Sequence, residues 1–119
     1  MTISSRITDA LNAVLTNTWA VELPPEPTFP AFVFEVNTAT EANWSPAEVY
    51  SQHEITVFIY VESKQQIATY RPQIVTAIET INDAGFRYFG EEESGDAGFE
   101  DFPGVYAYFI NFRIRERNA

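Results

Sequence analysis

The amino-acid sequence predicts an α+β domain in which two helices pack on one face of a roughly four-stranded, mainly antiparallel sheet. Two segments have apolar residues at intervals of three and four, which is typical of amphipathic helices. Other segments alternate between two faces, which is typical of strands. The elements follow the order helix, two strands, helix, two strands, and consecutive strands tend to pair antiparallel. A chain of 119 residues fits one domain, so we expect residues 1–119 to share one core.

The first predicted helix lies at the N-terminus and ends before Trp19. Its apolar stripe consists of Ile3, Ile7, Leu11, Val14 and Leu15. Ser4, Ser5 or Thr8 would cap its start, because a hydroxyl can accept a hydrogen bond from a free backbone amide. Asp9 would also interact favourably with the positive end of the helix dipole.

A proline-rich connector follows over Glu22–Pro30. Its prolines are Pro24, Pro25, Pro27 and Pro30. Proline lacks an amide donor and restricts φ, so this segment is neither helix nor central strand. Beyond it, alternating apolar residues predict a strand over Ala31–Val36. The polar stretch Asn37–Pro46 is expected to be a turn or loop.

The clearest strand is predicted over His53–Glu62. One of its faces carries Ile55, Val57, Ile59 and Val61, and the other carries Thr56, Phe58, Tyr60 and Glu62. Both faces are largely apolar, and the segment is rich in residues that favour strands. We therefore expect this strand to lie inside the sheet.

A second helix is predicted to run to about Ala84 and to stop at Gly85. Its stripe consists of Ile67, Tyr70, Ile74, Ile78 and Ile81. Because proline disrupts the interior of a helix, Pro72 is expected to lie in the first turn. The regular helix would then begin near Thr69 or Tyr70, and Ser63–Ala68 would be a separate turn.

The C-terminal part is predicted to contain two strands separated by an acidic loop. Phe86–Phe89 would be a short strand, and Gly90–Gly104 a loop punctuated by glycines. The last strand is predicted over Val105–Arg115. One of its faces carries Tyr106, Tyr108, Ile110, Phe112 and Ile114. After this strand, Glu116–Ala119 are expected to form a polar tail.

Composition restricts the functions that the chain can serve. The sequence has 17 acidic and 7 basic residues, and its net charge of −10 opposes binding to nucleic acid or anionic membranes. It has no cysteine, which excludes disulfides and thiolate sites. Met1–Asp9 lacks the apolar core of a signal peptide, and no apolar stretch is long enough to cross a membrane. We expect a cytosolic protein without a membrane partner.

His53 is the one histidine and the first candidate for acid–base catalysis. A general base needs an orienting carboxylate and a nucleophile within hydrogen-bond reach. Glu54 is adjacent, but neighbouring residues of a strand point to opposite faces of the sheet. We therefore expect His53 to be structural or exposed, and we predict no catalytic residues and no enzyme activity.

Metal and cofactor sites are not predicted either. One histidine and no cysteine exclude the usual zinc ligand sets. The acids near Gly95 and Gly98 would bind Ca²⁺ only loosely, because the ligand spacing of an EF-hand loop is absent. They would also repel phosphate, so these glycines do not form a phosphate-binding loop.

Two groups of charged residues are not explained by the packing of a small globular domain. The first is a group of acidic residues in the predicted loop: Glu91, Glu92, Glu93, Asp96, Glu100 and Asp101. Their mutual repulsion and the glycines among them predict a solvated, mobile segment.

The second feature is the alternation of Arg113, Arg115 and Arg117, which places all three guanidinium groups on one side of the last strand. One interpretation is ion pairing with the acid-rich remainder of the chain. The other is a docking edge for an acidic copy of the same chain or for a partner, since the planar guanidinium pairs well with carboxylates.

The order of these elements resembles a known family. After the N-terminal helix and the proline-rich connector come Pro30-Ala31-Phe32-Val33-Phe34 and the strand His53–Glu62. A helix with Ile74-Val75-Thr76-Ala77-Ile78, a variable loop and the aromatic strand Tyr106–Arg115 complete the pattern. The sequence resembles the tail-terminator, or tail-completion, proteins of long-tailed bacteriophages and related prophages, over nearly its whole length.

The resemblance implies a structural virion protein that assembles in the bacterial host cytoplasm and functions in the virion tail. It implies a homo-oligomer, most often a hexameric ring, that caps the completed tail tube and stops its polymerisation. The tail tube protein and the head connector or neck proteins would be its partners in head–tail joining. DNA would pass through the ring without specific binding, and the acidic segment Glu91–Asp101 would become ordered or face the lumen on assembly.

A second function class stays open. Aromatic residues on the strand faces would also suit a small α+β ligand-binding or regulatory module without catalysis. Size distinguishes the two classes, because a ring predicts a cyclic oligomer and a binding module predicts a monomer or dimer.

Overall fold

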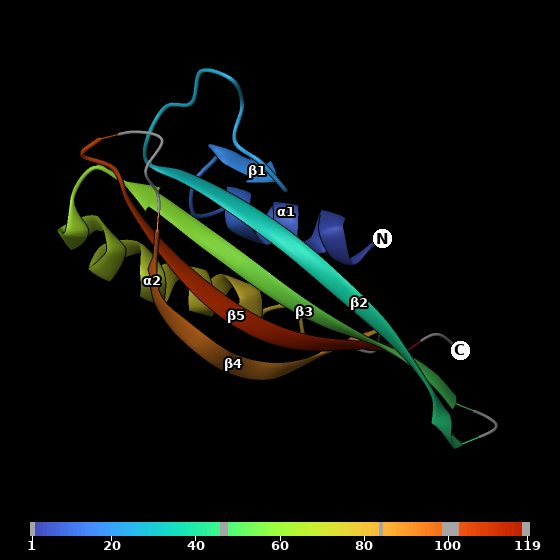
Figure 1. Cartoon of the computed structure of the whole chain (residues 1–119). Helices are drawn as coiled ribbons and strands as arrows, with labels where there is room; N and C mark the ends of the chain where they lie inside the picture. Colours follow the sequence, from blue (N-terminus) through green and yellow to red (C-terminus); the bar gives the residue numbers. More distant parts are fainter. Residues whose placement is uncertain (1, 46–47, 84, 99–102, 118–119) are drawn as a thin grey trace.

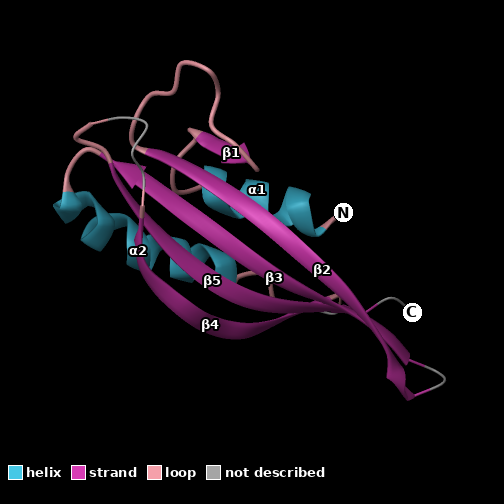
Figure 2. Cartoon of the chain, viewed as in Figure 1, coloured by secondary structure: helices cyan, strands magenta, loops and turns pink. Residues whose placement is uncertain are grey.

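A computed structural model describes residues 2–45, 48–83, 85–98 and 103–117. The elements follow the chain as α1 (Ile3–Asn12), β1 (Thr18–Ala20), β2 (Ala31–Ser45), β3 (Glu48–Val61), α2 (Lys64–Glu79), β4 (Phe86–Ala97) and β5 (Tyr106–Arg117). The strands form one twisted layer, and both helices lie on the same side of it (Figures 1 and 2). The α+β architecture with two helices on one face is therefore confirmed.

The sheet has five strands in the order β1-β2-β3-β5-β4, one more strand than the sequence predicted. β1 runs parallel to β2, and the other neighbours are antiparallel. The sheet is thus mixed, although antiparallel pairing dominates. β3 lies at its centre, as the apolar residues on both of its faces indicated.

The core lies between the sheet and the two helices. Its fully buried side chains include Ile7, Leu11, Phe32, Ile55, Val57, Ile59, Ile74, Ile78, Ile110, Phe112 and Ile114. The alternation predicted for His53–Glu62 and for Val105–Arg115 is confirmed, because the alternate residues of both strands face the helices. Phe32 also contacts the ring of Tyr70 edge to face, with 5.3 Å between ring centroids, which joins β2 to α2.

The start of α1 corrects the predicted cap. Thr2, rather than Ser4, Ser5 or Thr8, is the N-cap residue, and its hydroxyl accepts a hydrogen bond from the Ser5 amide at 3.1 Å. The Thr8 hydroxyl instead donates to the Ser4 carbonyl within the helix. The predicted cap positions lay too far along the chain because Ile3 already belongs to the buried stripe, so the helix begins before it.

The start of α2 also differs from the prediction. The helix begins at Lys64, with Ser63 as its N-cap, and Pro72 lies inside it. Proline removes one backbone hydrogen bond, but Pro72 is exposed, so its ring lies on the solvent side of the helix. Ile67 and Tyr70 precede it and pack against the core. This packing stabilises the first turns of the helix, in the segment Ser63–Ala68 that the sequence predicted to be a separate turn.

β1 was not predicted. It is a three-residue strand at the edge of the sheet, too short to show a periodic pattern. It ends where Val21 adopts a positive φ of 73°, which is strained for a β-branched residue. The Val21 amide donates to the Phe34 carbonyl at 2.9 Å, and this bond ties the start of the connector to β2.

Two predicted loops are strands. The segment Asn37–Pro46 was expected to be a loop, but β2 continues through Ser45 and pairs with β3. The segment Gly90–Gly104 was expected to be a loop, but β4 continues through Ala97 and pairs with β5. Both errors have one cause: polar residues remain in a strand when a neighbouring strand satisfies their backbone hydrogen bonds.

The β2–β3 hairpin extends beyond the helices at the end of the sheet near the C-terminus (Figure 1). The domain therefore measures 52 × 23 × 23 Å. β4 is less regular, because its register with β5 shifts between Tyr88 and Gly90 and again between Glu91 and Glu93. Gly90 has φ of +115° at the first shift, a conformation that glycine adopts without strain.

Candidate functional site

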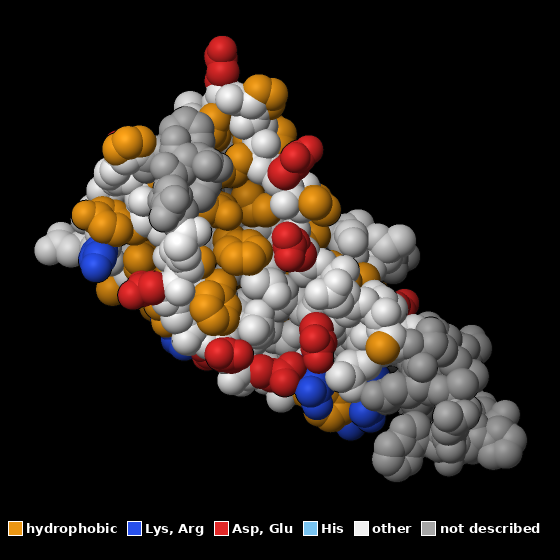
Figure 3. Space-filling model, in the orientation of Figure 1, with side chains coloured by type: hydrophobic (Ala, Val, Ile, Leu, Met, Phe, Trp, Pro, Cys, Tyr) orange, Lys and Arg blue, Asp and Glu red, His pale blue; other side chains and the backbone are white. Residues whose placement is uncertain are grey.

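The sheet face that points away from the helices, here called the open face, carries the most distinctive surface of the domain. Its accessible apolar side chains are Phe58, Tyr60 and Phe109, which are partly exposed and alternate with the core residues of β3 and β5. Ala31, Val33 and Ala107 point to the same face but are buried. The rings of Phe58 and Tyr60 stack at 6.3 Å. Figure 3 shows hydrophobic side chains gathered over one half of the molecule, with separate acidic groups among them, and both acidic and basic groups on the other half.

The arginine row predicted on the last strand lies on this open face. Because β5 continues to Arg117, the alternation places Arg113, Arg115 and Arg117 on the same side. Arg113 pairs with Glu92 of β4 at 3.1 Å, and both side chains are 40% exposed. Arg113 thus pairs with an acidic residue of its own chain, which was the first of the two interpretations of the arginine row. An exposed ion pair of this kind contributes at most about 1 kcal/mol to stability.

Arg115 and Arg117 lie apart from that pair, in a pocket of about 380 Å³ where β4 begins and β5 ends. This arginine pocket is lined by Asp83, Gly85, Phe86, Arg87, Phe89, Arg115 and Arg117. The Arg115 guanidinium lies 5.0 Å from the centre of the Phe89 ring, a distance suited to a cation–π contact. Sequence reasoning missed Arg87, because only the β4–β5 register places it directly opposite Arg115.

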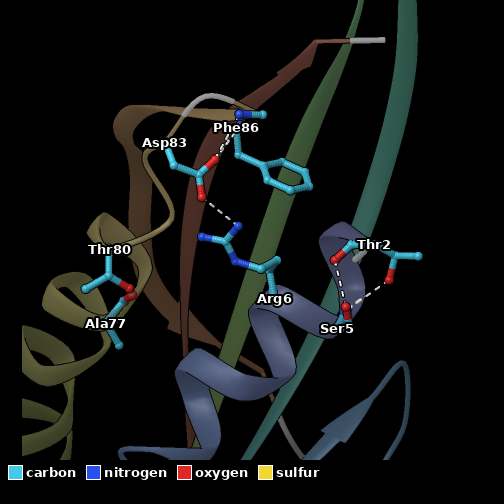
Figure 4. Close-up of polar contacts among 8 residues, drawn as sticks. Thr2, Ser5, Arg6, Ala77, Thr80, Asp83 and Phe86 are labelled. Carbon is cyan, nitrogen blue, oxygen red and sulfur yellow. Dashed lines mark hydrogen bonds and ion pairs between the residues drawn. The ribbon is translucent and has the colours of Figure 1, made fainter. Parts of the chain in front are cut away.

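Asp83 supplies the acidic group of the pocket, but its hydrogen bonds are directed to other groups (Figure 4). Its carboxylate accepts hydrogen bonds from the amides of Gly85 at 2.9 Å and Phe86 at 3.1 Å, and from Arg6 of α1 at 2.8 Å. The Gly85 amide, then Arg6 and the Phe86 amide, hold the pKa of Asp83 below its ordinary value. Arg6 also lies over the Phe86 ring at 5.2 Å, so this network joins α1 to the start of β4.

The acidic segment, predicted to be a loop, lies in strand β4 in its described part. Glu91 pairs with Arg71 of α2, and Glu92 pairs with Arg113. Glu93 lines a small polar pocket on the open face, and Asp96 lines another near Lys64. The expectation of a loop over these residues was wrong, because pairing with β5 and two ion pairs offset the repulsion. Glu100 and Asp101 lie outside the described residues.

Arg71 connects the helix layer to β4. It bonds to Glu91 and lies 3.3 Å from the Ser94 hydroxyl. Tyr108 and Glu91 raise the pKa of the Arg71 guanidinium further above its already high ordinary value. The Glu91 carboxylate therefore faces a permanent cation and belongs to the structural framework of β4.

His53 is buried on the helix side of the sheet. Its Nδ1 lies 2.8 Å from the Thr38 hydroxyl, and its Nε2 lies 2.8 Å from Glu116 Oε1. A carboxylate accepts hydrogen bonds, so Nε2 is the donor in the second contact. The side chain links β2, β3 and β5, which agrees with the structural role expected for it.

Within residues 2–45, 48–83, 85–98 and 103–117, no group of three acidic or histidine side chains is arranged to hold a metal ion. Neither α1 nor α2 is long and apolar enough to cross a membrane.

The chain is similar to known proteins in its fold. No protein-family model matches the sequence, and no curated protein matches it. Among solved structures, the fold is similar to that of a chain in the "Virion of native gene transfer agent (GTA) particle". The match has a TM-score of 0.60 and 14% sequence identity, and it covers 97% of this chain and 92% of that chain. At this identity, the similarity establishes a shared fold over essentially the whole domain.

Proposed function

We propose that this protein is a structural component of a phage-like virion. In this proposal it forms a ring of identical subunits, with six as the expected number, that caps the completed tail tube. The ring stops tube polymerisation and offers the head connector or neck proteins a surface for head–tail joining. The proposal implies assembly in the cytoplasm of the bacterial host and a final position in the virion tail.

The observation that carries the proposal is the fold shared with a chain of a virion particle over 97% of this protein. Fold alone does not determine function, so the surfaces are the second support. Three arginines line one pocket of a chain whose net charge is −10. A basic site on an acidic chain suits head-to-tail contacts, in which each subunit uses two different surfaces.

The apolar part of the open face supports the same proposal. Phe58 and Phe109 are only partly covered, and they lie beside each other in the β3–β5 register. Aromatic side chains of this kind supply most of the binding energy at protein interfaces, and charged groups at the rim set register and association rate. Assembly should therefore weaken with added salt without vanishing, because only the charged part is screened.

The overall charge supports a passive role toward DNA. A net charge of −10 repels phosphate groups, so DNA would pass through the ring without being retained. The expected result is weak or undetectable binding of duplex DNA at physiological salt, measured by fluorescence anisotropy with a labelled oligonucleotide.

The deciding experiment measures size and capping together. Sedimentation velocity and native mass spectrometry of the purified protein, alone and with tail tubes, should reveal a cyclic oligomer. Electron microscopy of growing tubes should show that the protein stops elongation and adds density at one end. A protein that stayed a monomer or dimer in both conditions would contradict the proposal and favour a small ligand-binding module.

A further inference from the structure

The arginine pocket has a charge distribution that the fold itself does not require. Arg87 and Arg115 lie directly opposite each other in the β4–β5 pair, and like charges in that position destabilise a sheet. Arg117 lines the same pocket. Three of the seven basic residues of an acidic chain are thus brought together at one end of the sheet.

The acidic residue of the pocket is already bound elsewhere. The Asp83 carboxylate accepts two backbone amides and the Arg6 guanidinium, as described above. Arg87 is exposed, and no acidic side chain in the described part of the chain forms an ion pair with it. An additional carboxylate would therefore find strong donors here, since charge-assisted bonds from guanidinium groups are among the strongest hydrogen bonds in proteins.

The connector at the opposite end of the sheet presents suitable carboxylates. Glu22 and Glu26 are exposed, and neither forms an ion pair within the described residues. Pro25 and Pro27 flank Glu26 and restrict its backbone. A segment restricted in this way loses little conformational entropy when it binds.

The connector cannot reach the arginine pocket of its own chain. It leads into Ala31, which is in register with Tyr60 of β3 and, through it, with Ala107 of β5. Arg115 lies eight residues further along β5, a separation of about 26 Å at the usual rise of a strand. Figure 1 shows the connector looping out at the end of the sheet that lies away from the C-terminus.

We infer that the arginine pocket receives the acidic, proline-rich connector of a second copy of this chain, with Glu26 bound among Arg87, Arg115 and Arg117. The two surfaces differ and lie at opposite ends of the domain, so the contact is head-to-tail and propagates from copy to copy. The inference rests on the proposed ring and identifies the two surfaces that join its subunits. It also assigns the central role to Arg87, which the alternation on β5 did not reveal.

Charge reversal tests the contact. Arg87→Glu and Glu26→Arg should each weaken assembly about tenfold, and the double variant should recover most of the loss. Lys64→Glu is the matched control, because it makes the same charge change on α2 outside the pocket and should leave assembly nearly unchanged. Sedimentation velocity over a range of protein concentrations measures the effect.

The direction of the Glu26→Arg effect excludes a general charge effect. This variant replaces a negative charge with a positive one and so reduces the size of the chain's net charge of −10; reduced overall repulsion would therefore strengthen assembly. A specific contact predicts that assembly weakens. Stronger or unchanged assembly of Glu26→Arg would overturn the inference.

Cysteine cross-linking provides an independent test, because the chain has no cysteine of its own. A variant carrying both Glu26→Cys and Arg87→Cys should form a ladder of covalent oligomers on mild oxidation. A variant carrying Glu26→Cys and Lys64→Cys should not. A ring that stays intact but yields no ladder with the first variant would overturn the contact.

The outcomes separate this inference from the proposed function. A ring that caps tubes but is indifferent to Glu26→Arg and Arg87→Glu overturns the contact and leaves the function standing. If a labelled oligonucleotide binds and Arg87→Glu abolishes that binding without affecting the ring, the pocket binds phosphate instead. Wild-type protein that remains monomeric alone and beside tail tubes overturns both the contact and the function.

Discussion

The two faces of the sheet differ although the same strands build both. On the helix side, Ile55, Val57 and Ile59 are fully buried, and the alternate residues Thr56, Phe58 and Tyr60 remain partly exposed on the open face. The helix side stabilises the domain through burial of apolar area. The open face keeps aromatic and charged groups accessible, which is the arrangement expected of a surface that binds another protein. Adjacent residues of one strand therefore point either into the core or to a surface that is accessible for the proposed assembly contacts.

The strongest test of this difference uses two neighbours on β3. Ile59→Ala should lower the free energy of unfolding by about 2–5 kcal/mol, because it leaves a cavity in a well-packed core. Phe58→Ala removes a larger side chain from the open face and should cost about 1 kcal/mol. Urea denaturation followed by circular dichroism measures both. A loss below about half a kcal/mol for Ile59→Ala would contradict its place in the core.

An intermediate effect is expected at His53, which lies two residues before Ile55 on the same face of β3. His53→Ala leaves the Thr38 hydroxyl and the Glu116 carboxylate without their buried partner and should cost about 1–3 kcal/mol. Gln52→Ala is the matched control on the open face and should change stability by less than about 0.5 kcal/mol. Equal losses for the two variants in urea denaturation would show that the hydrogen bonds of His53 contribute nothing.

A smaller effect on stability is expected at the arginine row. The double variant Arg113→Glu, Arg115→Glu should keep the fold and lose about 1 kcal/mol, because the pair that it breaks is exposed. Its effect should appear in assembly, as impaired ring formation or tail capping. Circular dichroism checks the fold, and tube-length measurement checks capping. Normal capping by the double variant would exclude Arg113 and Arg115 from the interface.

The smallest effect concerns Asp83 and depends on pH. Because the folded state lowers the pKa of Asp83, the carboxylate stabilises the fold above its unfolded pKa of about 3.9. That contribution is lost as the pH falls through the lower folded pKa. Asp83→Asn should therefore lower the thermal midpoint at pH 7, and its difference from wild type should shrink in acid. Asn82→Ala, a change at the exposed and non-titratable residue next to Asp83, is the control and should show no such trend.

The sequence alone predicted the elements that have dense, periodic apolar signals. The alternation in the strands around Ile59 and Phe112 and the helical stripe through Ile74 and Ile78 identified residues that are fully buried in the structure. These predictions succeeded because the signal is local: each residue's face follows from the period of its own element. The placement of both helices on one face followed from the same stripes, since each had to cover apolar sheet surface.

The extents of β2 and β4, the existence of β1 and the composition of the arginine pocket depended on the tertiary structure. Asn37 and Glu91 lie in strands because a neighbouring strand accepts their backbone hydrogen bonds, and no local pattern records that partner. Arg87 meets Arg115 through a register that includes two shifts along β4. Pairing register depends on residues far apart in the chain, so the alternation that predicted Arg115 on the open face could not indicate what lies opposite it.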